Sequence, residues 1–240
     1  MRSLSLPAVA LCIGLTVAGV DSRISRGNTN SLGQPFRKGS SIASKRSGNK
    51  KMYQSATTQR YRLDASQSKF IAHALAGGLL WFKGHDHLVA VREFAGEAQL
   101  TPNSITPASL AITAKTGSMV ETSSVFTEPQ KQIINKELRE IVLLPDRYPE
   151  IVFKSTNVTG KASALNQYDL KIIGDLTLHG ITRQITIPTK VTVTGNELRA
   201  QGEFSINRGD FKVKATSAVH GLVRVRDKVE FTFDIVGHQQ

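Results

Sequence analysis

From residue 61 to about residue 237, apolar positions recur mainly at every second residue of the chain. This period places one face of a β-strand in a core and the other face in solvent. The alternating apolar runs comprise Phe70, Ala72 and Ala74; Phe94, Gly96, Ala98 and Leu100; Leu110, Ile112 and Ala114; Ile151 and Phe153; Leu170 and Ile172; Ile185 and Ile187; Val191 and Val193; Leu198, Ala200, Gly202, Phe204 and Ile206; and Val229, Phe231, Phe233 and Ile235. Turn-forming residues at 76–78, 101–103, 159–161 and 194–196 separate these runs. Such spacing predicts an all-β fold, either an antiparallel sandwich or a barrel.

The segment 128–143 has a helical period instead. Its apolar positions are Ile133, Ile134, Leu138, Ile141 and Val142, with charged residues between them. Thr127 is suited to cap the start of a helix, and Pro145 is suited to end it. The sequence therefore predicts one amphipathic α-helix, which closes one end of the β-structure or packs across one of its faces.

Small residues occupy many of the alternating positions, namely Ala72, Ala74, Gly96, Ala98, Ala114, Ala200 and Gly202. A closed barrel of about eight strands has an interior just wide enough for packed side chains or one slender ligand. If the small residues face inward, they leave a tube lined by Phe70, Phe94, Ile112, Phe153, Phe204 and Phe231. If they face outward or pack beneath the helix, the barrel is filled. The sequence leaves both arrangements open.

The first 58 residues differ in composition from the rest. In residues 1–20, Arg2 precedes an apolar run over residues 4–20, which is typical of a secretory signal peptide or of an uncleaved membrane anchor. Residues 21–58 are rich in Ser, Gly, Asn, Lys and Arg and show no period, which predicts a disordered basic linker. We therefore expect a periplasmic or secreted protein whose folded domain spans residues 59–237.

The charge of the chain is concentrated outside the predicted domain. The formal net charge is +12, and residues 21–60 hold nine Lys and Arg against the single acid Asp21. Residues 61–240 hold 21 Lys and Arg against 18 Asp and Glu. A nucleic-acid-binding protein would carry its basic patch on the folded unit, so this distribution argues against a nucleic-acid partner.

The sequence offers little for nucleophilic catalysis. Cys12 is the only cysteine and lies in the predicted leader, so the body has neither a disulfide nor a thiol. The chain has no Gly-x-Ser-x-Gly motif. We therefore expect a protein that is not an enzyme and that needs no cofactor.

The segment Gly84-His85-Asp86-His87 supports an alternative function. His85 and His87 are two residues apart, which places both on one face of a strand, and imidazole suits zinc, copper, iron or nickel. A metal site needs at least a third ligand, for which Asp175, His179 and His220 are candidates. A metal-binding or redox-linked barrel is thus the second hypothesis. The other interpretation is a polar strand start at the barrel mouth with hydrogen-bonded histidines.

The stretch 174–183 reads Gly-Asp-Leu-Thr-Leu-His-Gly-Ile-Thr-Arg. Strand alternation places Asp175, Thr177 and His179 on one face, with Leu176, Leu178 and Ile181 in apolar packing. Gly180 then releases the chain into the next strand. We interpret His179 as a structural histidine, because a lone ring nitrogen lacks co-ligands.

Five motifs, in order along residues 61–236, resemble those of the YceI-like family of exported, lipocalin-like barrels that bind polyisoprenoids. They are Tyr61-Arg62-Leu63-Asp64; Phe94-Ala95-Gly96; residues 147–156, which begin Arg147-Tyr148-Pro149; the stretch 174–183; and Asn207-Arg208-Gly209-Asp210-Phe211. The chain departs from the family pattern at Gln67-Ser68, at Asn135-Lys136-Glu137-Leu138-Arg139 and at Lys212. The resemblance implies an antiparallel up-and-down barrel of about eight strands with one amphipathic helix.

The resemblance also implies that the barrel interior holds a long isoprenoid or similar apolar lipid for transport, storage or sensing. The candidate lipid-binding residues are Phe70, Ala72, Ala74, Phe94, Ile112, Phe153, Ile172, Phe204 and Phe231. A membrane tether through residues 4–20 and a homodimer remain open. A third hypothesis is a structural module with a filled barrel, whose surface binds a partner.

Overall fold

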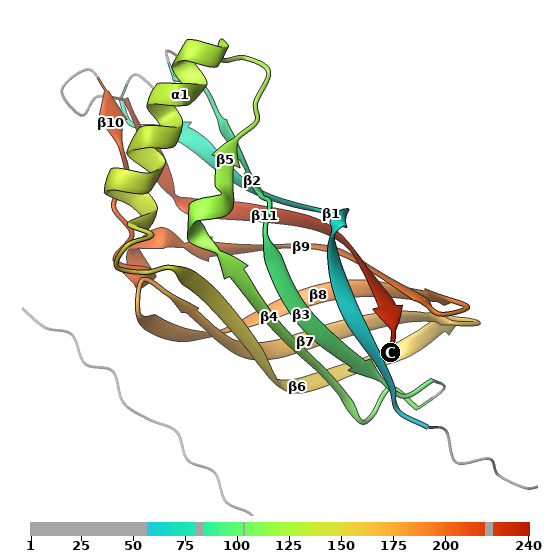
Figure 1. Ribbon diagram of the computed structural model, residues 1–240. Coiled ribbons are helices and arrows are strands. Elements are labelled where there is room, and N and C mark those ends of the chain that lie inside the picture. The colour runs from blue at the N-terminus through green and yellow to red at the C-terminus, as the bar shows by residue number, and fades with distance from the viewer. Residues whose placement is uncertain (1–56, 80–83, 103, 219–222) are drawn as a thin grey trace, which may run out of the picture. The chain divides into compact units, whose positions relative to one another are not determined.

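The computed structural model describes residues 57–79, 84–102, 104–218 and 223–240 (Figure 1). The predicted leader and tether, and nearly all of the predicted linker, lie outside these residues, as does His220. The division of the chain at residues 20, 58 and 237 therefore stays a prediction. Within the described residues, we find no helix with the length and apolar character needed to span a bilayer.

Eight of the strands described by the structure close into an antiparallel barrel. These are β1 (Gln59–Gly77), β3 (Phe94–Leu100), β4 (Ala108–Lys115), β6 (Glu150–Ala164), β7 (Gln167–Leu178), β8 (Ile181–Thr194), β9 (Glu197–Asn207) and β11 (Val223–Gln239). Each pairs with the next barrel strand along the chain, and β11 closes the ring by pairing with β1, from Tyr61↔Gln239 to Gly77↔Arg224. The predicted all-β, up-and-down barrel is confirmed.

Strand β7 shows why the sequence folds in this way. Its even-numbered side chains from Tyr168 to Leu178 are buried, whereas Lys171 and Asp175 are exposed. The pleat sends successive side chains to opposite faces, so the apolar set fills the interior and the polar set meets water. The period of two therefore decides which face of the strand is inside the barrel.

The hairpin between β7 and β8 corrects one prediction. His179 and Gly180 both have positive φ, at 52° and 71°, and Leu178 pairs with Ile181 across them. Positive φ at both central residues is the signature of a type I′ hairpin turn. Because β7 ends before His179, this side chain leaves the face of Asp175 and Thr177 and is buried, at 8% exposure. The expected placement of His179 on the Asp175 face was wrong.

Three further strands lie at one end of the barrel, away from the C terminus (Figure 1). They are β2 (His87–Val91), β5 (Met119–Glu121) and β10 (Ser217–Ala218). Strand β1 reaches this end by changing partner, because residues 59–62 pair with β3 and residues 71–74 pair with β2. Between these two parts a register shift separates Asp64 from Lys69 in the pairing with β11.

The predicted helix forms at the same end. It consists of α1 (Glu128–Glu137), which continues into the π-helical turn η3 (Leu138–Leu143). The backbone N–H of Thr127 donates to Gln130 Oε1 at 2.8 Å, which fixes the start of α1. No residue of α1 is buried, whereas Leu138 and Leu143 of η3 are. The helix is therefore anchored to the barrel mainly through its C-terminal turn.

Candidate ligand-binding site

A cavity of about 140 Å³ lies in the interior of the barrel. Its walls come from the inward faces of the barrel strands, together with Val91 of β2 and Met119 of β5. Among the described lining residues, only Gln99, Ser109 and Thr189 are polar, and the Thr189 hydroxyl donates to the carbonyl of Ile187. Apolar cavities of about this size stay dry and bind small apolar molecules. The barrel interior is thus built for apolar contact.

A second cavity, of about 150 Å³, lies at the end of the barrel covered by the helix. Ile134 of α1 and Leu138 of η3 form part of its wall. It shares five wall residues with the first cavity, namely Met119, Ile151, Leu178, Ile206 and Phe231. The two cavities are therefore neighbouring parts of one lumen, separated by these side chains.

The candidate residues predicted from the sequence fall on this lumen with one exception. Phe70, Ile112, Phe153, Ile172, Phe204 and Phe231 line the first cavity, and Ala72, Ala74 and Phe231 line the second. Phe94 lines neither cavity, because its ring packs edge-on against Phe70 with the centroids 6.3 Å apart. A contact between any of these residues and a ligand stays a prediction.

The small residues divide between the arrangements that the sequence left open, because Ala72 and Ala74 line the second cavity beneath the helix. Ala98, Ala114 and Ala200 line the first cavity. A methyl group added to Gly202 would come within 2.7 Å of the Phe233 ring, so neighbouring side chains fold over the inward glycines. Stacking of Phe204 on Phe231 at 4.8 Å fills more of the interior. The lumen is therefore narrow, because these side chains fill part of the barrel interior.

Sequence reasoning missed several lining residues. Phe233 lies in the same alternating run as Phe231 and lines the first cavity, yet it was not among the predicted lipid-binding residues. Met119 lies in the three-residue strand β5, which is too short to show any period. Leu63 precedes the register shift in β1, where alternation is interrupted. Only the closed barrel brings these side chains to one interior.

The polar residues of the second cavity include His87, Glu137, Arg208 and Lys214. Glu137 and Lys214 are exposed and carry opposite charges. Arg208 already donates to the carbonyls of Arg226 at 3.2 Å and Val213 at 2.8 Å, so it holds the loop that follows β9. The polar end of the lumen is thus the end covered by the helix.

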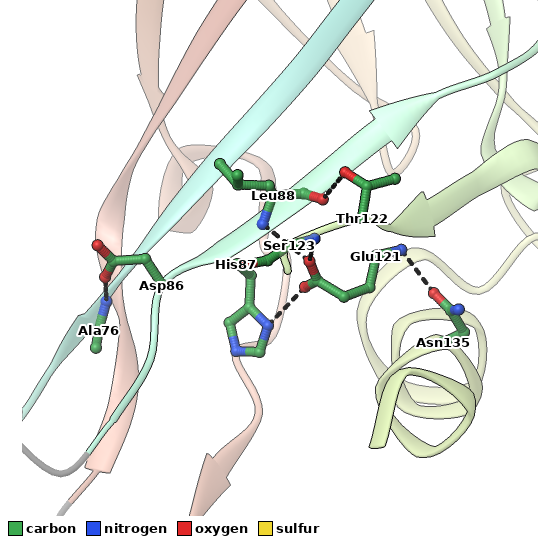
Figure 2. Close-up of polar contacts among 8 residues, drawn as sticks. All are labelled: Ala76, Asp86, His87, Leu88, Glu121, Thr122, Ser123 and Asn135. Atoms are coloured by element: carbon green, nitrogen blue, oxygen red, sulfur yellow. Dashed lines mark hydrogen bonds and ion pairs between the residues drawn. The ribbon is translucent and has the colours of Figure 1, made fainter. Parts of the chain in front are cut away.

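His87 is held by a buried carboxylate (Figure 2). The side chain of Glu121 is fully buried, and its Oε2 lies 2.9 Å from His87 Nδ1. Its other oxygen, Oε1, accepts from the backbone N–H groups of Leu88 at 3.1 Å and Ser123 at 2.7 Å. The Phe126 ring stacks on the face of the imidazole, with the ring centroids 5.2 Å apart. These contacts fix the orientation of His87.

The pKa of Glu121 is lowered despite its burial. Burial by itself raises the pKa of this carboxyl, but the hydrogen bonds from His87, Ser123 and Leu88 together outweigh that effect. Glu121 is therefore ionised at neutral pH and acts only as an acceptor. The backbone N–H of Glu121 donates to Asn135 Oδ1 at 2.7 Å, which ties α1 to the same cluster.

The structure places the segment Gly84-His85-Asp86-His87 at this end of the barrel. Asp86 accepts from the Ala76 backbone N–H at 2.8 Å (Figure 2). The His85 ring packs edge-on against Phe126. In the described part of the chain, no three His, Cys, Asp or Glu side chains gather as a metal site would require. Metal binding by His85 and His87 stays a prediction.

His179 lies near the end of η3, where its Nε2 is 3.2 Å from the carbonyl oxygen of Leu143. Burial lowers the pKa of His179, and the charge of Arg147 acts in the same direction, while the hydrogen bonds to Leu143 and Val142 oppose the shift. A buried, neutral and hydrogen-bonded ring at a hairpin turn has a structural role. It joins the β7–β8 hairpin to the helical segment.

The fold and the apolar lumen define an up-and-down β-barrel with a helix over one end. The model of the YceI-like domain matches residues 61–237. The chain therefore belongs to the YceI-like family, as its motifs suggested.

The relatives and solved structures agree with this assignment. A UPF0312 protein of Yersinia enterocolitica is 27% identical over 51% of this chain and 62% of its own length. A UPF0312 protein of Pseudomonas savastanoi pv. phaseolicola is 34% identical over 40% of this chain and 50% of its own length. The chain thus spans less than two thirds of these curated relatives.

Among solved structures, BcnA of Burkholderia cenocepacia superimposes with a TM-score of 0.56 at 20% identity, covering 72% of this chain and 98% of that one. A polyisoprenoid binding domain from Saccharophagus degradans, implicated in plant cell wall breakdown, gives a TM-score of 0.51 at 13% identity, covering 75% and 98%. At these identities the likeness concerns the fold alone.

Proposed function

We propose that this protein is an exported binding protein that holds a long isoprenoid or similar apolar chain in the barrel interior. The observation that carries the proposal is the lumen itself, in which two adjoining cavities are lined almost wholly by apolar side chains. The Saccharophagus degradans domain, which has a similar fold, is described as a polyisoprenoid binding domain. The ligand would serve transport, storage or sensing, without chemical conversion.

The physical basis of binding is desolvation. Each methylene that leaves water contributes about 0.8 kcal/mol, so seven methylenes contribute on the order of 5–6 kcal/mol before ordering costs. A ligand longer than one cavity crosses from the first cavity to the second past Met119 and Phe231. Met119 is suited to this position because its unbranched side chain adapts its shape to what it contacts.

Protein purified from its native source, extracted with organic solvent and analysed by mass spectrometry, tests the proposal. We expect one apolar lipid in a fixed ratio to protein, and native mass spectrometry should show the same added mass on the intact chain. Repeated absence of any lipid would overturn the proposal. N-terminal sequencing of the exported form tests whether residues 1–20 are removed or remain as an anchor.

A further inference from the structure

His87 differs from the other polar residues that line the second cavity, because a buried partner holds one edge of its ring. Glu121 Oε2 engages Nδ1 at 2.9 Å, and Phe126 stacks on the ring face. Among the described residues, no group hydrogen-bonds Nε2, and the side chain is 25% exposed. A fixed imidazole with one unused nitrogen at the wall of a cavity is a site for a polar ligand group.

The hydrogen bond to Glu121 determines which ring nitrogen of His87 carries the proton. An ionised carboxylate only accepts hydrogen bonds, so the neutral imidazole facing Glu121 must donate from Nδ1. Nε2 then has a lone pair and acts as an acceptor, on a side chain that forms part of the wall of the second cavity. The ligand group that complements it is a hydrogen-bond donor.

From this geometry we infer that His87 Nε2 accepts a hydrogen bond from a hydroxyl at the end of the lumen ligand, which is therefore an apolar chain bearing an alcohol or phenol. The inference rests on the proposed function, since it names the polar end of the same ligand. The apolar chain would extend from the second cavity into the first, and the hydroxyl would stay at the helix-covered end, the end with the polar lining residues.

The two carboxylate oxygens of Glu121 have separate partners, which gives a direct test. Both backbone N–H groups use Oε1, whereas His87 uses Oε2. In Glu121→Gln the amide oxygen can keep the two backbone bonds, and the amide NH₂ then faces His87 Nδ1. That NH₂ donates, so Nδ1 becomes the acceptor and the proton moves to Nε2. The substitution converts the cavity-facing nitrogen from an acceptor into a donor.

The experiment compares two probes, farnesol and its methyl ether, by titration at pH 8. Farnesol donates and accepts hydrogen bonds, whereas the ether only accepts. For the wild-type protein we expect farnesol to bind about 5–10-fold more tightly than the ether, as one lost hydrogen bond implies. In Glu121→Gln both probes can accept from Nε2–H, so the ratio should fall to about one.

Two further variants complete the test. In His87→Gln the side-chain amide can still donate to Glu121, but there is no second ring nitrogen to accept from the ligand. Its ratio of farnesol to ether affinity should therefore also be about one. This variant replaces Glu121→Gln as the test if Glu121→Gln fails to fold. His85→Gln is the matched control, because His85 also packs against Phe126 yet makes no bond to Glu121. Its ratio should equal that of the wild type.

The outcomes separate this inference from the proposed function. Equal binding of the two probes to the wild-type protein overturns the hydroxyl assignment and leaves the apolar-lipid proposal standing. An unchanged ratio in both Glu121→Gln and His87→Gln also overturns it. Much tighter binding of farnesyl phosphate than of farnesol would assign the polar end to an anionic group near Arg208 and Lys214 instead. Failure of every probe to bind contradicts both proposals.

Discussion

The imidazole of His179 lies nearly flat against the phenol ring of Tyr148, with ring centroids 4.4 Å apart and an interplanar angle of 21°. This stack packs the β7–β8 hairpin against the residues that follow η3. The left-handed backbone at His179 makes it possible, because the turn directs the ring inward where continued strand geometry would direct it outward. One hairpin turn therefore couples the barrel wall to the helix that covers its end.

His179 should make the stability of the domain depend on pH. Because the pKa of His179 is lowered by burial below its ordinary value of 6.5, the unfolded chain takes up a proton at this position first as pH falls. The contribution of neutral His179 is therefore complete above about pH 6.5 and is lost as pH falls toward the lower folded-state pKa. Urea unfolding at pH 7.5 and pH 5 should show the wild type losing more stability than His179→Asn.

Asparagine is the matched replacement because it tolerates the left-handed conformation and does not titrate. The other histidines are common to both proteins, so their effects cancel in the comparison. An equal loss of stability in the two proteins would show that His179 is not held neutral by the fold.

Gly174 should not tolerate a side chain. A Cβ built at this residue would lie 2.4 Å from the backbone oxygen of Lys154 on β6 and 2.6 Å from the Phe153 ring. Backbone cannot move aside without breaking the β6–β7 pairing, so Gly174→Ala should reduce the free energy of unfolding by about 1–3 kcal/mol. Denaturant titration measures the change.

Gly117→Ala is the control, because a Cβ there meets its nearest neighbour, Pro145, at 3.8 Å. It should change the free energy of unfolding by less than about 0.5 kcal/mol. Equal effects of the two substitutions would mean that the close approach at Gly174 is not what requires glycine.

Ala98 should control the width of the lumen. It lines the first cavity from β3, whereas Ala95 on the same strand is exposed. Ala98→Leu fills space that an apolar chain would occupy, and overpacking of about 1–3 kcal/mol corresponds to binding weakened by roughly 5–150-fold. Titration with farnesol, or quantification of co-purified lipid, checks this expectation.

Ala95→Leu adds the same atoms on the outer face and should leave lipid binding unchanged. If both variants bind lipid as the wild type does, the ligand does not occupy the first cavity.

Asn135 should hold α1 in place. Its Oδ1 accepts from the backbone N–H of Glu121, and no residue of α1 is buried. Asn135→Ala removes this acceptor at a cost of about 1 kcal/mol, with most of the effect confined to the helix. Hydrogen exchange should show faster exchange of the α1 amides, with the barrel strands unchanged.

Gln132→Ala, at an exposed position of the same helix, controls for the change in helix propensity. Its α1 amides should exchange at the wild-type rate. Faster exchange in both variants would mean that loss of the bond to Glu121 is not what loosens α1, because alanine favours the helix at either position.

The sequence by itself determined the architecture, because alternation and capping are local properties. The period of two along β7 and β9 predicted the strands and their buried faces, and Thr127 with the pattern from Ile133 to Val142 predicted the helix. The motif at 174–183 supported the family assignment. The π-helical turn at residues 138–143 was not predicted, since a helical period looks the same for both forms.

The tertiary structure decided the content of the interior. Alternation alone could not say whether Ala98 and Ala200 faced a tube or a helix, because that depends on closure between β1 and β11. It could not show that Met119 and Phe231 lie between the two cavities of the lumen. No sequence pattern marked Glu121 as a functional residue, because its partners lie on β2 and in the loop before α1. His87, on β2, is 34 residues away in the sequence. A buried carboxylate acquires its role only from the groups that the fold brings to it.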